Sequence, residues 1–356
     1  MDLWHRSPDI GCEQAQDELA AAGLTDGLPV VPPTPERVAR MLNACMLDPA
    51  EILAVLPPSY IQATWQDVAI NAVMAGCRPD YLPVVGAAIA AIAADEFNLL
   101  GIATTTGSAT PLVIVNGPIA RAIGMNAETN ALGQGNRANA TIGRAVHLAL
   151  QNIGGAKPGE TDMATLGQPG KYTFCCAENE AASPWPPLHV ERGFAASASV
   201  VTVVGASGTI EVVDSESLTA ADLTQTFAQS MLIAGNVGSA GLLGGGEPLI
   251  IMPPEHAFVF KREGYTKEQV KAAIYERAVL TVDRLSAPMR ERVRANAAAD
   301  GASAVVRVAN SPQDVMIVVA GGVGRKATYV PTWSGATRSV SRRLGAALNA
   351  GPARSP

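Results

Sequence analysis

The spacing of hydrophobic positions changes near residue 99. Before that point the pattern predicts helices at residues 13–22, 35–45, 67–75 and 81–94. Thr34 stands before Pro35, an order typical of a capping residue followed by proline at the first helical position. The Ala-rich stretch 81–94 is shorter than a bilayer span and is followed by Asp95 and Glu96, so it predicts a buried helix.

Beyond residue 99, short apolar runs bounded by glycine and proline alternate with helical stretches, which is typical of an α/β core. Strands are predicted at residues 112–115, 200–204, 210–213, 249–252, 305–308 and 315–319. Helices are predicted at residues 138–153, 218–233, 267–278 and 289–298. The expected fold class is therefore α/β, with mixed or mostly parallel sheets.

The pattern divides the chain into four parts. We expect a helical N-terminal segment (residues 1–55), a first α/β half (56–195), a second α/β half (196–345) and a flexible tail (346–356). Gly-Ser-Ala turns at residues 107–109 and 238–240 each precede a Pro-Leu strand, at residues 111–115 and 248–252. A duplication that relates the two halves is one explanation of this weak repeat.

Composition narrows the class of protein. The chain has 356 residues, of which 48% are hydrophobic, a composition that fits a folded protein. Its formal net charge is −6. A negative charge disfavours nucleic acid or an anionic membrane as the partner. The first residues show no basic region followed by an apolar stretch, so we expect a cytoplasmic protein. Five cysteines without CxxC spacing predict reduced thiols.

The densest group of chemically active side chains falls within residues 174–193. Its members are Cys175, Cys176, Glu178, Glu180, His189 and Arg192. A histidine or arginine near a cysteine lowers the pKa of the thiol, which predicts a nucleophilic or redox thiolate, with the two glutamates moving protons or binding a metal. Adjacent cysteines in a strand point to opposite faces, so at most one of the two faces the site. The alternative interpretation is a buried strand end whose carboxylates pair with Arg192.

Cys77 is the other candidate for a reactive thiol. It stands beside Arg78 and just before Pro79, where a helix is expected to begin, so the helix dipole and the guanidinium would favour its thiolate. A plain buried cysteine is the alternative interpretation.

Cofactor signals are few. In a nicotinamide-binding site the glycine-rich turn follows a strand and begins a helix. Neither glycine-rich run, at residues 241–247 or 321–324, has both neighbours in the predicted pattern. The sequence also contains no P-loop motif for ATP. His256 follows a predicted strand, and a divalent metal is conceivable if His256, His189 and Glu178 converge.

Amides and cations suggest where a substrate binds. The candidate substrate-binding residues are Asn116, Asn136, Arg137, Arg144, Arg192, Gly322 and Arg325. Amides and glycines before the helix at 138–153 favour a carboxylate or phosphate cradle, although an ordinary capped helix with Asn136 as the cap explains the same pattern. The basic residues near 325 are explained slightly better as a solvated surface.

Five motifs carry a resemblance to a known family: TDGLPVVPPT at residues 25–34, MAGCRP at 74–79, VNGP at 115–118, GNRANA at 135–140 and ENE at 178–180. In these motifs the chain resembles a poorly characterised bacterial family, the relatives of the UGSC-motif (seleno)proteins. The tetrapeptide itself is absent, because Gly11-Cys12 is followed by Glu13. The resemblance implies a bacterial cytosolic enzyme or enzyme subunit with thiol chemistry and indicates no substrate.

Taken together, these patterns predict an enzyme that acts on a small anionic organic substrate by cysteine thiolate chemistry. The alternatives are a metal-dependent lyase or hydrolase, and a non-catalytic subunit of a heteromeric enzyme. A homo-oligomer or a heteromeric complex is expected. Because ligands bind beyond the carboxyl ends of strands, the loops after Val115, Met252 and Ala320 should converge with residues 175–192.

Overall fold

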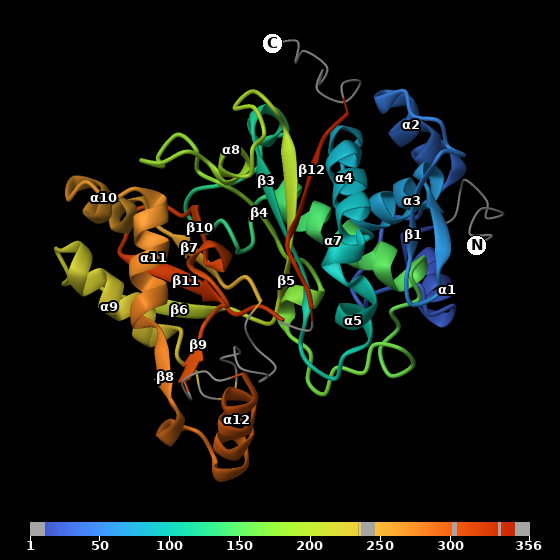
Figure 1. The fold of residues 1–356 in the computed structure, drawn as a ribbon. Coiled ribbons are helices and arrows are strands. Elements are labelled where there is room, and N and C mark those ends of the chain that lie inside the picture. Colours follow the sequence, from blue (N-terminus) through green and yellow to red (C-terminus); the bar gives the residue numbers. More distant parts are fainter. Residues whose placement is uncertain (1–10, 234, 236–245, 301–304, 334–335, 346–356) are drawn as a thin grey trace.

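The computed structural model describes residues 11–233, 235, 246–300, 305–333 and 336–345. The chain is an α/β protein in which helices cover two four-stranded sheets (Figure 1). The predicted tail at 346–356, the turn at 238–240 and most of the glycine-rich run at 241–247 lie outside the described residues.

The first sheet has the strand order β12-β5-β3-β4. Its strands are β3 (Thr110–Asn116), β4 (Cys175–Ala177), β5 (Val200–Ala206) and β12 (Val340–Arg343). β3 and β4 are parallel, whereas β5 runs antiparallel to both β3 and β12. This parallel pair brings the ends of two strands to the same edge.

The second sheet has the order β10-β7-β11-β6. Its strands are β6 (Ile210–Val213), β7 (Leu249–Met252), β10 (Met316–Val319) and β11 (Lys326–Val330). β7 and β10 are parallel, and β11 runs antiparallel to both β7 and β6, so the directions repeat those of the first sheet. The two prolines of the weak repeat have similar places: Pro111 is the second residue of β3, and Pro248 directly precedes β7.

The two sheets exchange their fourth strands. β6 follows β5 in the chain but pairs with β11, whereas β12 follows β11 but pairs with β5. The crossing is marked by a bridge between Ala206 and Thr332, flanked by hydrogen bonds from Ser207 N–H to Pro331 O and from Trp333 N–H to Gly205 O. Each sheet is therefore completed by a strand from the other part of the chain.

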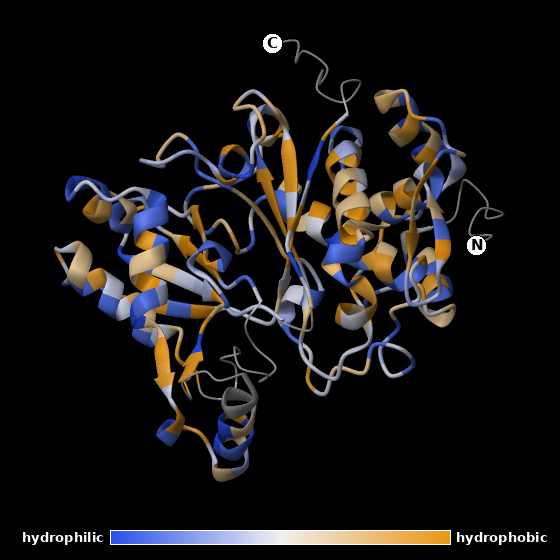
Figure 2. Cartoon of the chain, in the orientation of Figure 1, coloured by the Kyte–Doolittle hydropathy of each residue, from blue (hydrophilic) through white to orange (hydrophobic). Residues whose placement is uncertain are grey.

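Alternation of side chains along the strands builds three cores. In β3, Leu112 and Ile114 pack in a cluster shared with the second sheet, while Val113 and Val115 pack against helices. The helices over the first sheet are α3 (Trp65–Ala75), α4 (Leu82–Ile92) and α7 (Arg137–Asn152). Those over the second sheet are α9 (Ala220–Ser230), α10 (Pro254–Arg262) and α11 (Lys267–Arg277). The result is a helix–sheet–sheet–helix arrangement, with hydrophobic strands inside (Figure 2).

The N-terminal part begins with α1 (Cys12–Ala21) and α2 (Pro35–Cys45), as predicted. Thr34 caps α2 by accepting a hydrogen bond from Arg37 N–H. A hairpin of β1 (Ile52–Leu56) and β2 (Ile61–Thr64) follows. The remaining elements are α5 (Leu99–Thr104), α6 (Pro118–Ala122), α8 (Leu188–Glu191), α12 (Ala287–Asp300) and the antiparallel pair β8 (Val279–Thr281) and β9 (Val305–Arg307).

The expected sheet type is confirmed in part. Each four-stranded sheet has one parallel and two antiparallel strand pairs, so the sheets are mixed, and the expectation that they are mostly parallel is wrong. Residues 320–325 between β10 and β11 are too few for a parallel crossover, so β11 runs back antiparallel to β7.

The expected division between residues 195 and 196 stays a prediction. Beyond that point, β5 and β12 pair within the first sheet. No single helix of the described residues is long and apolar enough to cross a bilayer, although the bent pair Pro79–Ile92 and Asp95–Thr104 together meets that length and composition.

Candidate functional site

Polar side chains meet where β3 and β4 end. Asn116 is the last residue of β3, and Glu178, Asn179 and Glu180 come directly after β4. The parallel pairing of Val115 with Ala177 places these residues at one edge of the sheet. Asn116 and Glu178 are buried, whereas Glu180 is partly exposed.

The amide of Asn116 joins the two glutamates. Its Nδ2 donates to Glu178 Oε2 at 2.7 Å and to Glu180 Oε1 at 3.1 Å. Gly117 N–H also donates to Glu180 Oε1, at 2.6 Å, and Leu188 N–H donates to Glu178 Oε2, at 2.8 Å. Gly117 has φ +84°, and a Cβ there would lie 2.0 Å from the carbonyl oxygen of Ala198, so glycine is required for this close approach.

Three buried polar atoms of this cluster have no hydrogen-bond partner in the described part of the chain. They are Asn116 Oδ1, Glu178 Oε1 and His189 Nδ1. Buried polar atoms are almost always paired, so three orphans in one cluster call for an explanation such as a bound molecule.

Burial raises the pKa of Glu178 above its ordinary value, although Lys267 and the hydrogen bonds from Leu188 and Asn116 act to lower that pKa. The charge of Glu180 adds to the rise. Since Oε2 already accepts two N–H donors, a proton on this carboxyl belongs on Oε1. Glu178 is thus suited to donate a proton from Oε1.

His189 belongs to α8, and its side chain is completely buried. Its Nε2 is 3.4 Å from the carbonyl oxygen of Ala196, an atom that only accepts, so Nε2 carries the proton in this contact. Its Nδ1 lies 3.9 Å from Glu180 Oε1. In the neutral ring Nδ1 is therefore the acceptor, close to the partly exposed carboxylate.

A buried ion-pair group, which the sequence analysis missed, holds the segment that carries His189. Lys267 Nζ donates to Pro186 O at 2.7 Å and lies 3.2 Å from Glu191 Oε2, while Lys271 bonds to Glu191 Oε1. Although burial alone would raise the pKa of Glu191, the two lysines lower it. The signal was the spacing of four between the lysines, which places both on one face of α11.

A cavity of about 540 Å³ opens in front of the two glutamates. Its polar lining residues are Arg121, Asn126, Glu128, Thr129, Gln134, Asn136, Glu178, Asn179 and Glu180. Asn136 caps α7 by accepting from Asn139 N–H, so the positive end of that helix dipole lies at the rim. We call this space the acidic cavity.

The predicted convergence is confirmed for the loops after Val115 and Ala320 by backbone contacts, whereas the loop after Met252 contributes no residue to the acidic cavity. Asn179 N–H donates to Val319 O at 2.7 Å, and Gly321 N–H donates to Ala127 O at 2.9 Å. Gly322 packs so closely on Thr129 that a Cβ would lie 2.0 Å from its hydroxyl oxygen. The loops after β3, β4 and β10 therefore meet beside the acidic cavity, and Gly322 supports its wall without lining it.

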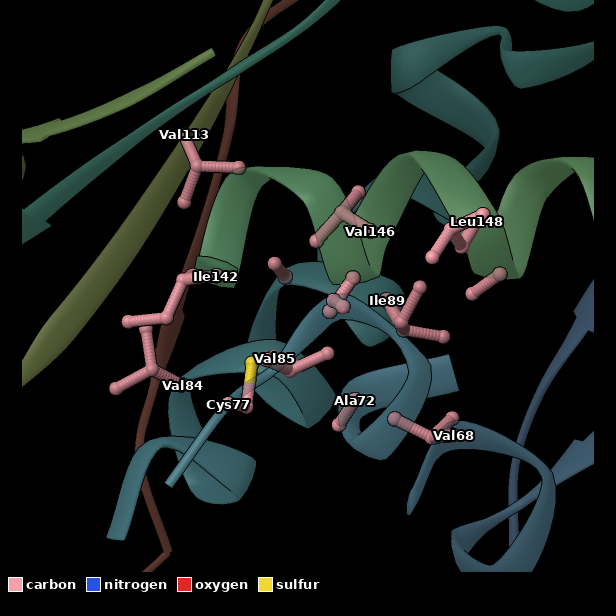
Figure 3. Close-up of a cluster of buried hydrophobic side chains, with 14 of the residues drawn as sticks. Val68, Ala72, Cys77, Val84, Val85, Ile89, Val113, Ile142, Val146 and Leu148 are labelled. Atoms are coloured by element: carbon pink, nitrogen blue, oxygen red, sulfur yellow. The ribbon is translucent and has the colours of Figure 1, made fainter. Parts of the chain in front are cut away.

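The predicted cysteines do not form this site. Cys77 packs among helix side chains and donates to Thr141 O, and Figure 3 shows its sulfur amid aliphatic groups. Cys175 packs on the helix side of β4, and Cys176 lies between the sheets. Burial raises the pKa of Cys77 and of Cys176 to about 12 and raises the pKa of Cys175 well above its ordinary value. This environment disfavours a thiolate at all three positions.

Four predicted arginines make contacts within the protein. Arg137 donates to Gly76 O, and Arg144 forms a bidentate pair with Asp26 at 2.7 and 2.8 Å. Arg192 bonds to the backbone and hydroxyl of Ser339, and Arg325 donates to Ser215 O and Ser217 O. These four guanidinium groups are absent from the lining of the acidic cavity.

Arg121, which the sequence analysis did not single out, does line the cavity. It stands near the end of α6, five positions after the last residue of β3. Its carbonyl oxygen accepts from Gly124 N–H, but its guanidinium makes no hydrogen bond or ion pair within the described ranges. A position soon after a strand end was the available signal.

The three expected metal ligands are not brought together. His256 Nε2 contacts Asp214 O at 2.9 Å, and its ring meets Phe227 edge-on in the core under the second sheet. Burial lowers the pKa of His256. Across the residues placed by the structure, no group of three His, Cys, Asp or Glu side chains has the geometry to hold a metal ion.

No protein-family model, curated protein or solved structure matches the chain. The resemblance to the UGSC-motif relatives stays a prediction.

Proposed function

We propose that the chain is an enzyme that moves protons on a small hydroxylated carboxylic acid, with Glu178 and Glu180 as its acid and base. The observation that carries this proposal is the pair of glutamates sharing one buried amide, beside three unpartnered buried polar atoms and a cavity. Two carboxyl groups in unequal surroundings are the usual means of running acid and base chemistry at one site.

The roles follow from exposure and hydrogen bonding. Glu180 is the more exposed, and its Oε1 is oriented by Gly117 N–H and the Asn116 amide, so it serves as the base. Glu178, whose pKa is raised by burial, serves as the acid through Oε1. His189 Nδ1, 3.9 Å from Glu180, is placed to share the proton that Glu180 takes up.

Arg121 supports the expected anionic substrate. As the cation on the lining without a partner inside the described structure, it is suited to bind a carboxylate. The amides of Asn126, Gln134 and Asn136 on the same lining suit hydroxyl groups. In the proposed reaction Glu180 takes a proton from the carbon next to the carboxylate, and Glu178 gives one to the departing hydroxyl, which leaves as water.

Proton abstraction is testable without knowing the product. Purified protein is incubated in D₂O with a panel of small hydroxycarboxylic acids, and deuterium at the carbon next to the carboxylate is followed by NMR. We expect Glu180→Gln to slow this exchange about 100-fold or more, the usual range for losing a general base. Arg121→Gln should mainly raise KM.

A matched control is Glu211→Gln, an exposed glutamate of β6 in the second sheet, which should leave exchange unchanged. Exchange that survives Glu180→Gln, or a panel with no exchange at all, would refute the proposal. The thiolate chemistry expected from the sequence predicts instead that Cys175→Ala or Cys176→Ala abolishes turnover.

We also infer that the two sheets descend from one repeated unit, which is supported by their identical strand directions and exchanged fourth strands. Glu178 N–H donates to Val115 O, and Ala320 N–H donates to Met252 O in the same way. These two hydrogen bonds match Ala320 with Glu178, so Gly322 corresponds to Glu180. The second sheet therefore has no carboxylate at either of these two positions.

Oligomer formation and the non-catalytic subunit alternative stay predictions. Light scattering on the purified chain measures the first. Exchange catalysed by the chain alone would remove the second.

A further inference from the structure

A second cavity, of about 630 Å³, lies at the opposite end of β3 from the acidic cavity. Thr110 and Pro111, at the start of β3, line it, whereas Asn116 ends the strand at the acidic site. At about 3.3 Å per residue, the strand separates the two places by about 20 Å. The two cavities share no lining residue.

The walls of this cavity are largely apolar. Ile102 and Ala103 of α5, Leu150 of α7 and Ala156 contribute to them. Leu166 lines the cavity too, although its side chain is 94% exposed. An apolar side chain left in water beside a cavity favours a ligand that covers it, because burial of apolar area is the general driving force of such binding.

The charges around this cavity are already neutralised. Lys171 Nζ donates to Asp162 Oδ1 at 2.7 Å, and Asp26 is held in the bidentate pair with Arg144. A charged ligand would have to compete with these partly buried pairs, and separating one partner from such a pair is costly. The lining therefore favours an uncharged ligand.

Among the described lining residues, His147 has the one buried side-chain atom without a hydrogen-bond partner. His147 lines the cavity, and its Nδ1 lies 3.4 Å from Thr110 Oγ1. Its Nε2 is buried and has no partner among the residues that the structure describes. Burial, assisted by the charge of Lys171, lowers the pKa of His147 to about 4, so the ring is neutral near pH 7. Nε2 thus offers a single hydrogen-bonding position.

We propose that this cavity binds an uncharged, mainly apolar small molecule through its walls and through one hydrogen bond to His147 Nε2. The proposal does not depend on the acid–base function of the other cavity. It also gives a role to the segment that contains Thr25 and Asp26, which lines this cavity and which the acid–base proposal leaves unused.

The test uses the full chain and a neutral fluorescent probe, N-phenyl-1-naphthylamine, which is mainly apolar and has one N–H group. We expect saturable one-to-one binding, with displacement by 1-naphthol and displacement by 1-naphthoate at least about tenfold weaker, since the charged form must be desolvated without a partner. His147→Phe keeps an aromatic ring without Nε2 and should weaken binding about tenfold, the upper range for one neutral hydrogen bond.

Leu166→Asp is the second variant, because a residue 94% exposed can be replaced without disturbing the core. It should weaken the probe about tenfold, the scale expected when the apolar contact of one side chain is lost. Val323→Asp, at a residue 99% exposed and absent from this lining, is the matched control and should bind like the wild type. Circular dichroism confirms that each variant is folded.

The proposal is overturned by absence of saturable binding, by equal displacement with 1-naphthol and 1-naphthoate, or by equal effects of the Leu166 and Val323 substitutions. Glu180→Gln separates this proposal from the proposed enzyme function. It should abolish deuterium exchange at the acidic cavity and leave probe affinity unchanged. A loss of probe binding in Glu180→Gln would place the probe in the acidic cavity and overturn the inference.

Discussion

Replacing Asn116 with leucine tests whether the shared amide stabilises two carboxylates. Leucine has nearly the same size, so the substitution removes the Nδ2 donor to Glu178 and Glu180 with little change of packing. Each carboxylate keeps one backbone donor, from Leu188 or Gly117. The variant should fold but be less stable.

The magnitude follows from the contacts. Two hydrogen bonds to charged groups at about 1.5–3 kcal/mol each give a loss of about 3–6 kcal/mol. Removing the unpartnered Oδ1 of Asn116 relieves a desolvation cost of about 1–3 kcal/mol. We therefore expect a net loss of about 2–3 kcal/mol in the free energy of unfolding near pH 8, where carboxylates are most ionised.

The loss should depend on pH in a definite direction. Burial raises the pKa of Glu178 in the folded protein above its pKa in the unfolded chain. Between these two pKa values the folded state therefore binds more protons than the unfolded state. The folded state loses stability as the pH rises from the unfolded pKa through the folded pKa. Without the amide the folded pKa rises further. The difference between variant and wild type should thus grow with pH and be smallest below the unfolded value of about 4.3.

Urea unfolding followed by tryptophan fluorescence, at pH 4 and pH 8, measures both quantities. Asn152→Leu is the control, because Asn152 is also buried and donates two hydrogen bonds, but to the neutral atoms Leu24 O and Asn71 Oδ1. Its loss of stability should be the same at both pH values. Equal losses at the two pH values for Asn116→Leu would refute the claim that its amide supports ionised carboxylates.

Three further outcomes are expected. Glu178→Gln should raise Tm near pH 8 and leave it unchanged below pH 4, because the substitution removes the destabilising buried charge. An unchanged Tm at both pH values would contradict the raised pKa of Glu178. Gly117→Ala should lower the free energy of unfolding, measured by urea titration, by more than about 2 kcal/mol, because its Cβ would lie 2.0 Å from Ala198 O. A urea midpoint equal to that of the wild type would argue against this close contact. Cys77 and Cys176 should not react with a thiol-specific disulfide reagent in the native protein near pH 8 but should react in urea. The reason is that burial raises the pKa of each thiol to about 12. Rapid labelling of either cysteine in the native protein would support a thiolate function instead.

Local signals explain what could be predicted. Thr34 before Pro35 and Asn136 before the helix at 138–153 proved to be caps, because capping depends on residues within a few positions. Apolar runs bounded by glycine or proline gave most of the central strands correctly.

Partner choice between distant segments could not be predicted. Nothing in residues 210–213 or 340–343 indicates that each strand joins the other sheet, because strand pairing is decided by the whole core. Likewise, the sequence places Cys176 and Glu178 two positions apart, but only the layered packing buries the thiol between sheets and leaves the carboxyl at a cavity. Residue type indicated the chemistry, and the topology decided which groups are accessible.

The exchange of fourth strands also constrains the order of folding. During synthesis β3, β4 and β5 leave the ribosome long before β12, which lies more than a hundred positions after β5 and is the last strand in the part of the chain that the structure describes. Until β12 arrives, the edge of β5 that it will occupy stays unpaired, and exposed strand edges promote aggregation. The first sheet therefore cannot close until β12 has been synthesised, so slow elongation or early termination before β12 would expose the half that carries the acidic cavity.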